Sequence, residues 1–298
     1  MINIGFKQLD SFTGGFKEDD LIIAGIAGSI YDEKVLINII RNVTNQNKKV
    51  LYISFVENNR FKNRLEELNG LAVCETDVIP DTNSIKRSCE KCKDMNLVII
   101  HSFDSLFYRS KIYKTKENVY CQLKLLAQTI QTPIFATFSL RNNTQTVDDS
   151  IIRQYLDGTI VNNYEYIDNL IFFYQPNSGR SKIGYPIEAK AYDIKRMTER
   201  TAYMYAFYGY IELIEWDEKA RDLLQNALSL GLNDDDAIEY VLYWSGKKSP
   251  EKSLGLRNDG AISCDVINWD DIETSEDDDY NYMVDETNVF KTQSGASK

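Results

Sequence analysis

The sequence of 298 residues predicts an α/β fold, in which a twisted, mostly parallel sheet carries helices on both faces and continues into antiparallel strands. Three observations lead to this class. Short β-branched apolar runs alternate with helical patterns over the first two thirds of the chain, and closely spaced strands follow. Near residue 211 the balance of charge then changes sign, which indicates a separate C-terminal part.

Four apolar runs predict the parallel strands, and they lie at 20–26, 48–55, 96–103 and 132–139. Between them apolar residues recur at helical spacing. We expect these helices at 32–46, 58–70 and 117–131. Strands and helices that alternate in this way are typical of a parallel sheet covered on both faces.

Shorter spacing between apolar runs follows in the next part of the chain. Strands joined by short links are typical of antiparallel pairing. We therefore expect an antiparallel extension of the sheet built from 158–163, 169–175, 187–194 and 201–209.

Two amphipathic segments, 211–231 and 233–246, predict a small helical hairpin. Gly231 is suited to end the first helix, and Asn233 or Asp234 is suited to cap the second. We therefore divide the chain into a body at 1–210, a helical appendage at 211–246 and an acidic tail at 247–298.

The charge is unevenly distributed along the chain. Residues 1–210 carry 26 Lys and Arg against 24 Asp and Glu, whereas residues 211–298 carry 8 against 21. A nearly neutral body with an acidic end predicts weak or absent DNA binding and no attachment to anionic membranes. Within the tail, 265–286 holds ten acidic residues and no Lys or Arg, which predicts disorder or a motif that folds on a partner.

The five cysteines are irregularly spaced, and we find neither a leader peptide nor an apolar run long enough for a membrane span. These features predict reduced thiols and a cytoplasmic protein. Cys89 and Cys92 have the spacing of a zinc knuckle, but no second pair exists and His101 is the only histidine. We therefore expect two incidental thiols and no metal.

The opening stretch IGFKQLDSFTGGFKEDDLIIAGIAGS resembles the start of the RecA-like ATPase domain of DnaB-type replicative helicases, and weaker similarity continues to about residue 208. That family combines a Gly-Phe-x-x-Leu-Asp motif with a Gly-Gly pair, an Asp-Leu pair, an apolar strand and a phosphate loop. The matching residues are Gly5, Phe6, Leu9, Asp10, Gly14, Gly15, Phe16, Asp20, Leu21, Ile22, Ile23 and Gly25.

The phosphate loop of this family ends in Gly-Lys-Thr, whose lysine neutralises the phosphates and whose hydroxyl holds Mg²⁺. Counted back from Asn38, which matches a helix residue of the family, these positions fall on Tyr31, Asp32 and Glu33. A carboxylate about 4 Å from a phosphate charge repels it by about 4 kcal/mol at an effective dielectric constant near 20, which lowers affinity about a thousandfold. The resemblance thus predicts a degenerate nucleotide site.

A longer loop would leave an alternative site, in which Gly25, Gly28 and Ser29 cradle the phosphates and Lys34 supplies the cation. Val35 would then occupy the hydroxyl position. This arrangement is a weak candidate, since it needs both a different spacing and a residue without an oxygen.

Other functional positions of the family are also altered. His101 stands where the third strand should end in a magnesium-ordering Asp, and Ser139 replaces a Gln that senses the γ-phosphate. Glu57 lies near the position of the catalytic Glu, and Arg196 falls on the arginine finger that reaches a neighbouring subunit. Both are candidate remnants, although exposed or ion-paired residues are common on any surface.

Two loops of the helicases hold single-stranded DNA, and they correspond here to 141–150 and 177–184. The first is almost uncharged, and only Arg180 and Lys182 give the second a weak phosphate-binding character.

We therefore expect a catalytically inactive, DnaB-helicase-like pseudoenzyme that serves as a scaffold or regulator in DNA replication or recombination. No cofactor is expected, its partners would be replication proteins such as a RecA-like helicase ring or its loader, and a homo-oligomer stays open. One alternative is a divergent helicase or translocase that uses ATP and Mg²⁺ through Lys34, with Glu57 as the base. Another is an adaptor unrelated to DNA that works through its acidic tail.

Overall fold

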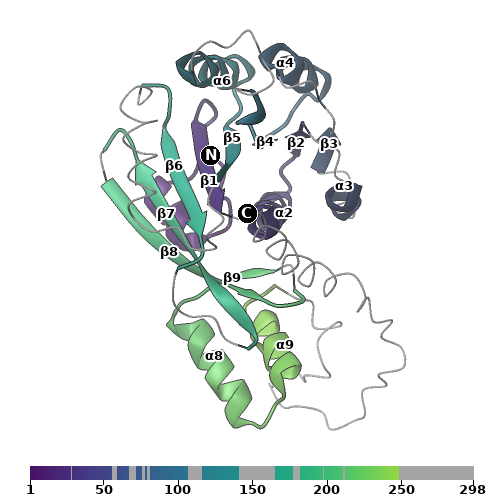
Figure 1. Cartoon of the computed structure of the whole chain (residues 1–298), viewed down its shortest axis with the longest axis vertical. Helices are drawn as coiled ribbons and strands as arrows, with labels where there is room; N and C mark the ends of the chain where they lie inside the picture. The colour runs from purple at the N-terminus through teal and green to yellow at the C-terminus, as the bar shows by residue number, and fades with distance from the viewer. Residues whose placement is uncertain are drawn as a thin grey trace, which may run out of the picture. The chain divides into compact units, whose positions relative to one another are not determined.

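The computed structural model (Figure 1) describes residues 1–27, 29–55, 59–66, 72–75, 78, 81–106, 116–140, 165–176, 182–196, 198–210 and 212–247. These residues fall into two compact units, Met1–Asn226 and Ala227–Lys298, and each unit is treated by itself. Among them, no helix combines the length and apolar character needed to cross a lipid bilayer.

The first unit is built on one sheet, which contains nine strands in the described part of the chain, in the order β3-β2-β4-β5-β1-β6-β7-β8-β9. Neighbouring strands from β3 to β6 are parallel, and β6 to β9 are antiparallel. The predicted class, a mostly parallel sheet with an antiparallel extension, is confirmed. The strands are β1 Leu21–Ala27, β2 Val50–Ser54, β3 Ala72–Glu75, β4 Leu97–His101, β5 Ile134–Leu140, β6 Asn169–Tyr174, β7 Gly184–Asp193, β8 Thr198–Phe207 and β9 Leu213–Glu215.

Strand β6 corrects one expectation. The sequence placed 169–175 in the antiparallel extension, but β6 runs parallel to β1, with Asn169 beside Ile22. A long connection separates β5 from β6, which gives the chain room to cross back to the starting edge, as parallel pairing requires. The antiparallel extension therefore begins only at β7. The strand predicted at 158–163 lies outside the described residues.

Helices cover both faces of the sheet (Figure 1). Apolar side chains of α1, α2 and α3 share one core with the sheet, and those of α4 and α6 share a second core on the other face. The predicted helices correspond to α2, α3 and α6, whereas α1, α4 and strand β3 were not predicted. The bounds are α1 Lys7–Thr13, α2 Ser29–Thr44, α3 Asn59–Glu66, α4 Thr82–Lys91 and α6 Lys116–Ile130.

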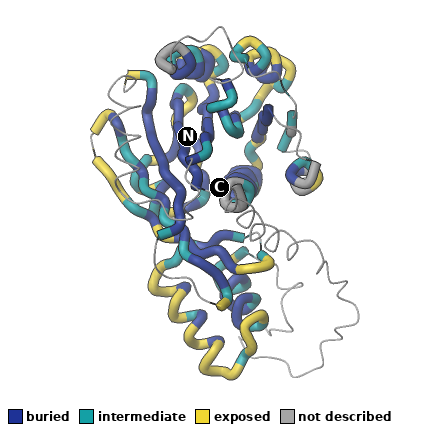
Figure 2. Tube along the Cα trace, in the orientation of Figure 1, coloured by how far each residue is buried: buried dark blue, intermediate teal, exposed yellow. Residues whose placement is uncertain are grey.

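Strand β1 lies between these two cores, and each of its residues is buried (Figure 2). Ile22, Ala24 and Ile26 belong to the core that contains α2, while Leu21 and Ile23 belong to the core that contains α6. Because successive side chains point to opposite faces of a strand, a strand covered on both faces reads as a continuous apolar run.

The end of the sheet also differs from the prediction. A helix was expected from residue 211, but Leu213–Glu215 form β9 beside β8, and α8 (Glu218–Ser229) begins only afterwards. Pairing with β8 buries Leu213 and Ile214, which outweighs their local helical preference. Gly231 follows α8 with a positive φ of 79°.

The second unit contains the end of α8 and α9 (Asp234–Trp244). Asn233 caps α9, as predicted, by accepting the backbone N–H of Asp236 at 2.9 Å. Five apolar side chains of α9, from Ala237 to Leu242, are buried. The predicted division at 210 and 246 stays a prediction, and the tail from 248 lies outside the described residues.

The N-terminal segment is held in place by the residues that match the helicase motif. Asp10 accepts the backbone N–H groups of Ile4 and Gly5 at 2.8 and 2.9 Å, and Asn42 of α2 donates to the carbonyl of Ile4 at 3.0 Å. Gly5 has a φ of 82°, and a Cβ there would lie 2.3 Å from the Asn42 side chain. The motif therefore closes a turn and seats it on α2.

Asp168 forms an ion cluster at the amino edge of the parallel strands. Its buried carboxylate accepts the N–H of Leu21 at 2.8 Å and the ammonium groups of Lys124 and Lys195 at 2.7 and 2.5 Å. Burial alone raises the pKa of the Asp168 carboxyl, but these hydrogen bonds outweigh it and leave the pKa below its usual value. The cluster ties the start of β1 to α6 and to the β7–β8 turn.

Replacing Asp168 with Asn should lower the free energy of unfolding at pH 7 by about 3–5 kcal/mol, because the buried Lys124 ammonium loses its counter-ion. Since a lowered carboxyl pKa stabilises the fold above the unfolded value of about 3.9, the difference from wild type should shrink as the pH falls below that value. Urea unfolding at several pH values measures this difference.

The matched control is Asp19→Asn, because Asp19 lies 3.8 Å from the same lysine and its side chain is about half exposed. It should change stability by about 0.5 kcal/mol or less. A deficit of Asp168→Asn that stayed constant from pH 7 to pH 3 would contradict the role of the charge.

Candidate functional site

The carboxyl edge of the parallel strands is the place where α/β sheets bind ligands. In register, Ile26 lies beside Ser139, and Ala27 lies beside Leu140. The structure thus brings the end of β1, the start of α2 and Ser139 to the same edge, at which β4 also ends with His101. This edge is the candidate site that the sequence predicts.

The connection from β1 to α2 is short. Strand β1 ends at Ala27 and helix α2 begins at Ser29, so that a single residue, Gly28, separates them. A phosphate loop instead places several residues between strand and helix, whose N–H groups surround the phosphates. Gly28 and the side chains of Ser29 and Asp32 lie outside the described residues, while Glu33 is described and half-buried.

Gly25, a candidate for the phosphate loop, lies inside β1 and pairs with Phe138 and Phe172 on the two neighbouring strands. A Cβ at this position would lie 2.8 Å from the ring of Phe172, 2.9 Å from that of Phe138 and 3.0 Å from Leu140. Aromatic packing on both sides therefore requires a residue without a side chain here. Gly25 serves the core in this structure.

Lys34, the alternative phosphate-binding cation, contacts the antiparallel part of the sheet. Its Nζ donates to the carbonyl of Phe207 at 3.1 Å and lies 5.6 Å from the ring centroid of Tyr185. A cation over an aromatic face is attracted by the ring quadrupole. Lys34 would have to leave both partners to reach a phosphate at the end of β1.

Lys34 belongs to a row of polar side chains on α2, the α2 polar row, which also contains Asn38 and Arg41. Asn38 accepts the N–H of Leu213 at 3.0 Å and donates to the carbonyl of Lys34 at 2.8 Å. Arg41 pairs with Glu212 at 3.2 Å. Spacings of four and three residues place the row on one face of the helix, which is therefore attached to the β8–β9 segment.

His101 shares a hydrogen bond of 2.7 Å between its Nδ1 and the hydroxyl of Tyr52. Tyr52 is fully buried and packs against Phe61, with ring centroids 4.5 Å apart. Beyond His101, the backbone of Phe103 donates to the carbonyl of Thr137 at 2.7 Å. This end of β4 is thus organised by packing and hydrogen bonds, and it presents an imidazole where the ATPases present a carboxylate.

The remaining candidates are dispersed. Ser139 is partly exposed on β5, and Lys182 is exposed just before β7. Arg196 lies in the β7–β8 turn with its side chain 75% exposed, 3.5 Å from Asp193. Since Asp193 pairs with the first residue of β6, Asn169, this turn lies at the amino edge, away from His101 and Ser139. Glu57 and Arg180 lie outside the described residues.

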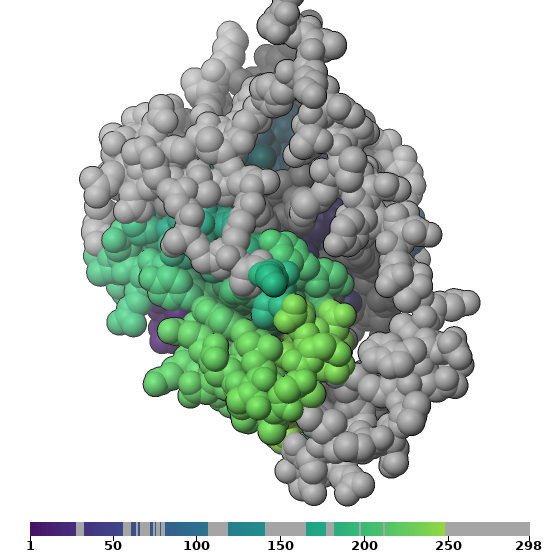
Figure 3. All heavy atoms as spheres, turned by 60° about the horizontal axis from the view of Figure 1, so that its bottom comes forward, coloured from purple at the N-terminus to yellow at the C-terminus, as the bar shows by residue number. Residues whose placement is uncertain are grey.

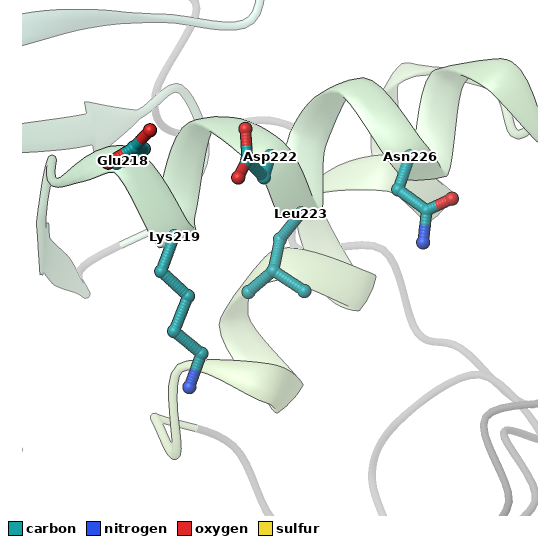
Figure 4. Close-up of a pocket in the computed structure, with 5 residues that line it drawn as sticks. All are labelled: Glu218, Lys219, Asp222, Leu223 and Asn226. Atoms are coloured by element: carbon teal, nitrogen blue, oxygen red, sulfur yellow. The ribbon is translucent and has the colours of Figure 1, made fainter.

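Neither cavity that the described residues enclose lies at the carboxyl edge. The larger, about 540 Å³, is a depression along α8 lined by Glu218, Lys219, Asp222, Leu223 and Asn226. Figure 4 shows these side chains projecting from one helix, and Figure 3 shows that helix at the surface. Polar groups from other elements do not converge there, as a binding site requires. The second cavity, about 250 Å³, lies beside the ends of α4 and α6.

A conventional metal centre is also absent from the described part of the chain, where no three His, Cys, Asp or Glu side chains group closely enough to hold an ion. Two residues that organise the site were missed from the sequence. Tyr52 was hidden in a strand of apolar residues, where its hydroxyl was the one available signal. Leu213 is engaged through its backbone, for which a sequence carries no signal.

Solved structures with the same fold include a separate "ATPase domain", which is 14% identical over 72% of this chain and 91% of that chain, with a TM-score of 0.56. A "DnaB-like replicative helicase", solved with "its interactions with primase", is 13% identical over 72% of this chain and has a TM-score of 0.57. The match covers 63% of that helicase. The expected DnaB-type, RecA-like fold is thereby confirmed. No family model and no curated protein matches the sequence.

Replacing Asn38 with Ala should lower the free energy of unfolding by about 1–3 kcal/mol, because the N–H of Leu213 would be buried without an acceptor. Chemical denaturation measures the change. Asn45→Ala is the matched control, since Asn45 is exposed just beyond α2, and its effect should stay within about 0.5 kcal/mol. Equal effects of the two variants would show that the Asn38 amide does not attach α2 to β9.

Proposed function

We propose that this chain with a DnaB-type, RecA-like fold is a catalytically inactive pseudoenzyme that acts as a scaffold or regulator in DNA replication or recombination. The observation that carries the proposal is the direct passage from β1 into α2, with one residue between strand and helix. Such a connection lacks the succession of backbone N–H groups that holds a triphosphate.

Charge at the start of α2 supports the same conclusion. Asp32 and Glu33 stand at the positions of the phosphate-binding Lys and the metal-binding Thr. Each carboxylate opposes a phosphate charge by about 4 kcal/mol at 4 Å and an effective dielectric constant near 20. That energy separates a micromolar from a millimolar dissociation constant.

The two positions that would have to compensate are engaged elsewhere. Lys34 holds the carbonyl of Phe207, and His101 holds the hydroxyl of Tyr52. Neither side chain can order a magnesium ion, since an ammonium has no lone pair and the imidazole Nδ1 is already hydrogen bonded. A divergent ATPase would need both contacts to break when the nucleotide binds.

A scaffold role fits the surfaces that remain. Arg196 is exposed on a turn at the amino edge, where it can face a neighbouring subunit of a helicase ring or a loader. The acidic C-terminal part, with 8 Lys and Arg against 21 Asp and Glu, suits competition with DNA for a basic surface of such a partner.

Calorimetry with ATP and Mg²⁺ on the full chain should give a dissociation constant weaker than about 1 mM, that is, a binding free energy of less than about 4 kcal/mol. Lys34→Met should leave the titration unchanged, because Lys34 has a structural role. Micromolar binding that Lys34→Met abolished would replace the proposal with the divergent ATPase.

Purification of the tagged full chain from its native cell should recover DNA replication or recombination proteins. Deleting residues 247–298 should preserve most of this binding if the folded body docks on a ring or loader. Loss of all binding on deletion would favour the tail-based adaptor, and recovery of partners unrelated to DNA would exclude a role in replication.

A further inference from the structure

A cluster of three sulfur atoms lines the second cavity, at the edge of the sheet opposite to the candidate nucleotide site. Cys89 lies in the last turn of α4, Cys92 is the residue that caps it, and Met95 follows three residues later, before β4 begins. All three line one cavity of about 250 Å³.

The geometry of the helix end brings the two thiols close together. Residues three apart on a helix have Cβ atoms about 5–6 Å apart. Two metal–thiolate bonds of about 2.3 Å each, the length found for zinc, span a similar distance. Cys89 is 8% exposed, whereas Cys92 is half-buried, so that one ligand is fixed in the core and the other is accessible.

Met95 is positioned by its own backbone. The hydroxyl of Thr132 donates to the carbonyl of Met95 at 3.1 Å, which fixes the segment between α4 and β4 against the end of α6. Val98 and Ile130 supply an apolar wall to the same cavity, and Lys93 supplies a cation.

We propose that Cys89, Cys92 and Met95 form a binding site for one soft monovalent cation of the copper(I) class. Thiolate and thioether sulfur select soft ions, and such an ion is satisfied by two or three ligands, whereas structural zinc takes four. Two thiolates and one monovalent ion carry a net charge of −1, which Lys93 offsets. Each thiol releases its proton as the metal–sulfur bond forms, and the oxidation state of the metal does not change.

Burial supports this role by keeping the pair reduced. It raises the pKa of the Cys89 thiol to about 12 and also raises that of Cys92. Because the thiolate is the form that oxidants attack, these thiols resist oxidation until a metal with high affinity for sulfur displaces the protons. The site is independent of the proposed function, since it lies at the amino end of β4.

The test is a competition titration of the reduced full chain, without oxygen, using copper(I) bound to a chromophoric chelator. We expect one equivalent to bind and a thiolate-to-copper absorption band to appear in the ultraviolet. Cys92→Ser should lower the affinity about 100-fold or more, and Met95→Leu, which preserves volume, should lower it about 10-fold. Cys121→Ser is the matched control, because Cys121 is a half-buried thiol outside the cavity, and it should bind as wild type does.

Two results would overturn the proposal. One is unchanged copper(I) affinity in both Cys92→Ser and Met95→Leu, whose half-buried positions make misfolding an inadequate explanation. The other is zinc(II) binding at least as tightly as copper(I) in the wild-type chain, since the sulfur set would then show no preference for a soft ion.

Discussion

Helix α2 is apolar on almost every side, and the need to satisfy its few polar groups constrains the rest of the structure. Six apolar residues between Val35 and Val43 are buried. A helix that is buried all round cannot leave a side-chain amide or ammonium without a partner. The α2 polar row finds its partners in the β8–β9 segment, about 170 residues further along the chain. These contacts join the parallel half of the sheet to its antiparallel half.

This attachment also determines what the start of α2 is able to do. A nucleotide at the end of β1 would require the helix start to open and Lys34 to turn away from Phe207. Each buried polar group that loses its partner costs about 1–3 kcal/mol. Disturbing two or three members of the row therefore costs as much as the roughly 4 kcal/mol that separates micromolar from millimolar binding. The packing of α2 and the carboxylates at its start oppose nucleotide binding independently.

Much of the fold could be read from the sequence, because buried parallel strands appear as uninterrupted apolar runs. Strand β3 was missed because its four residues include Cys74 and Glu75 and leave too short an apolar signal. Strand β6 was recognised but misplaced, since its direction depends on a crossover rather than on its own residues. At the site, the substituted charges at Asp32, Glu33 and His101 were visible in the sequence. The partners of Lys34 and His101 were not, because each depends on a long-range contact.

The opening motif identified the fold correctly and yet carries no information about activity, for a physical reason. Gly5 and Asp10 close a turn that rests on Asn42 of α2, so their replacement would disturb the packing of a central helix. Asp32 and Glu33, by contrast, follow a strand that packs through Gly25 whatever residues come after it. Substitutions there change the affinity for phosphate without removing a core contact. A chain can therefore keep the motif and the fold while its nucleotide chemistry is replaced.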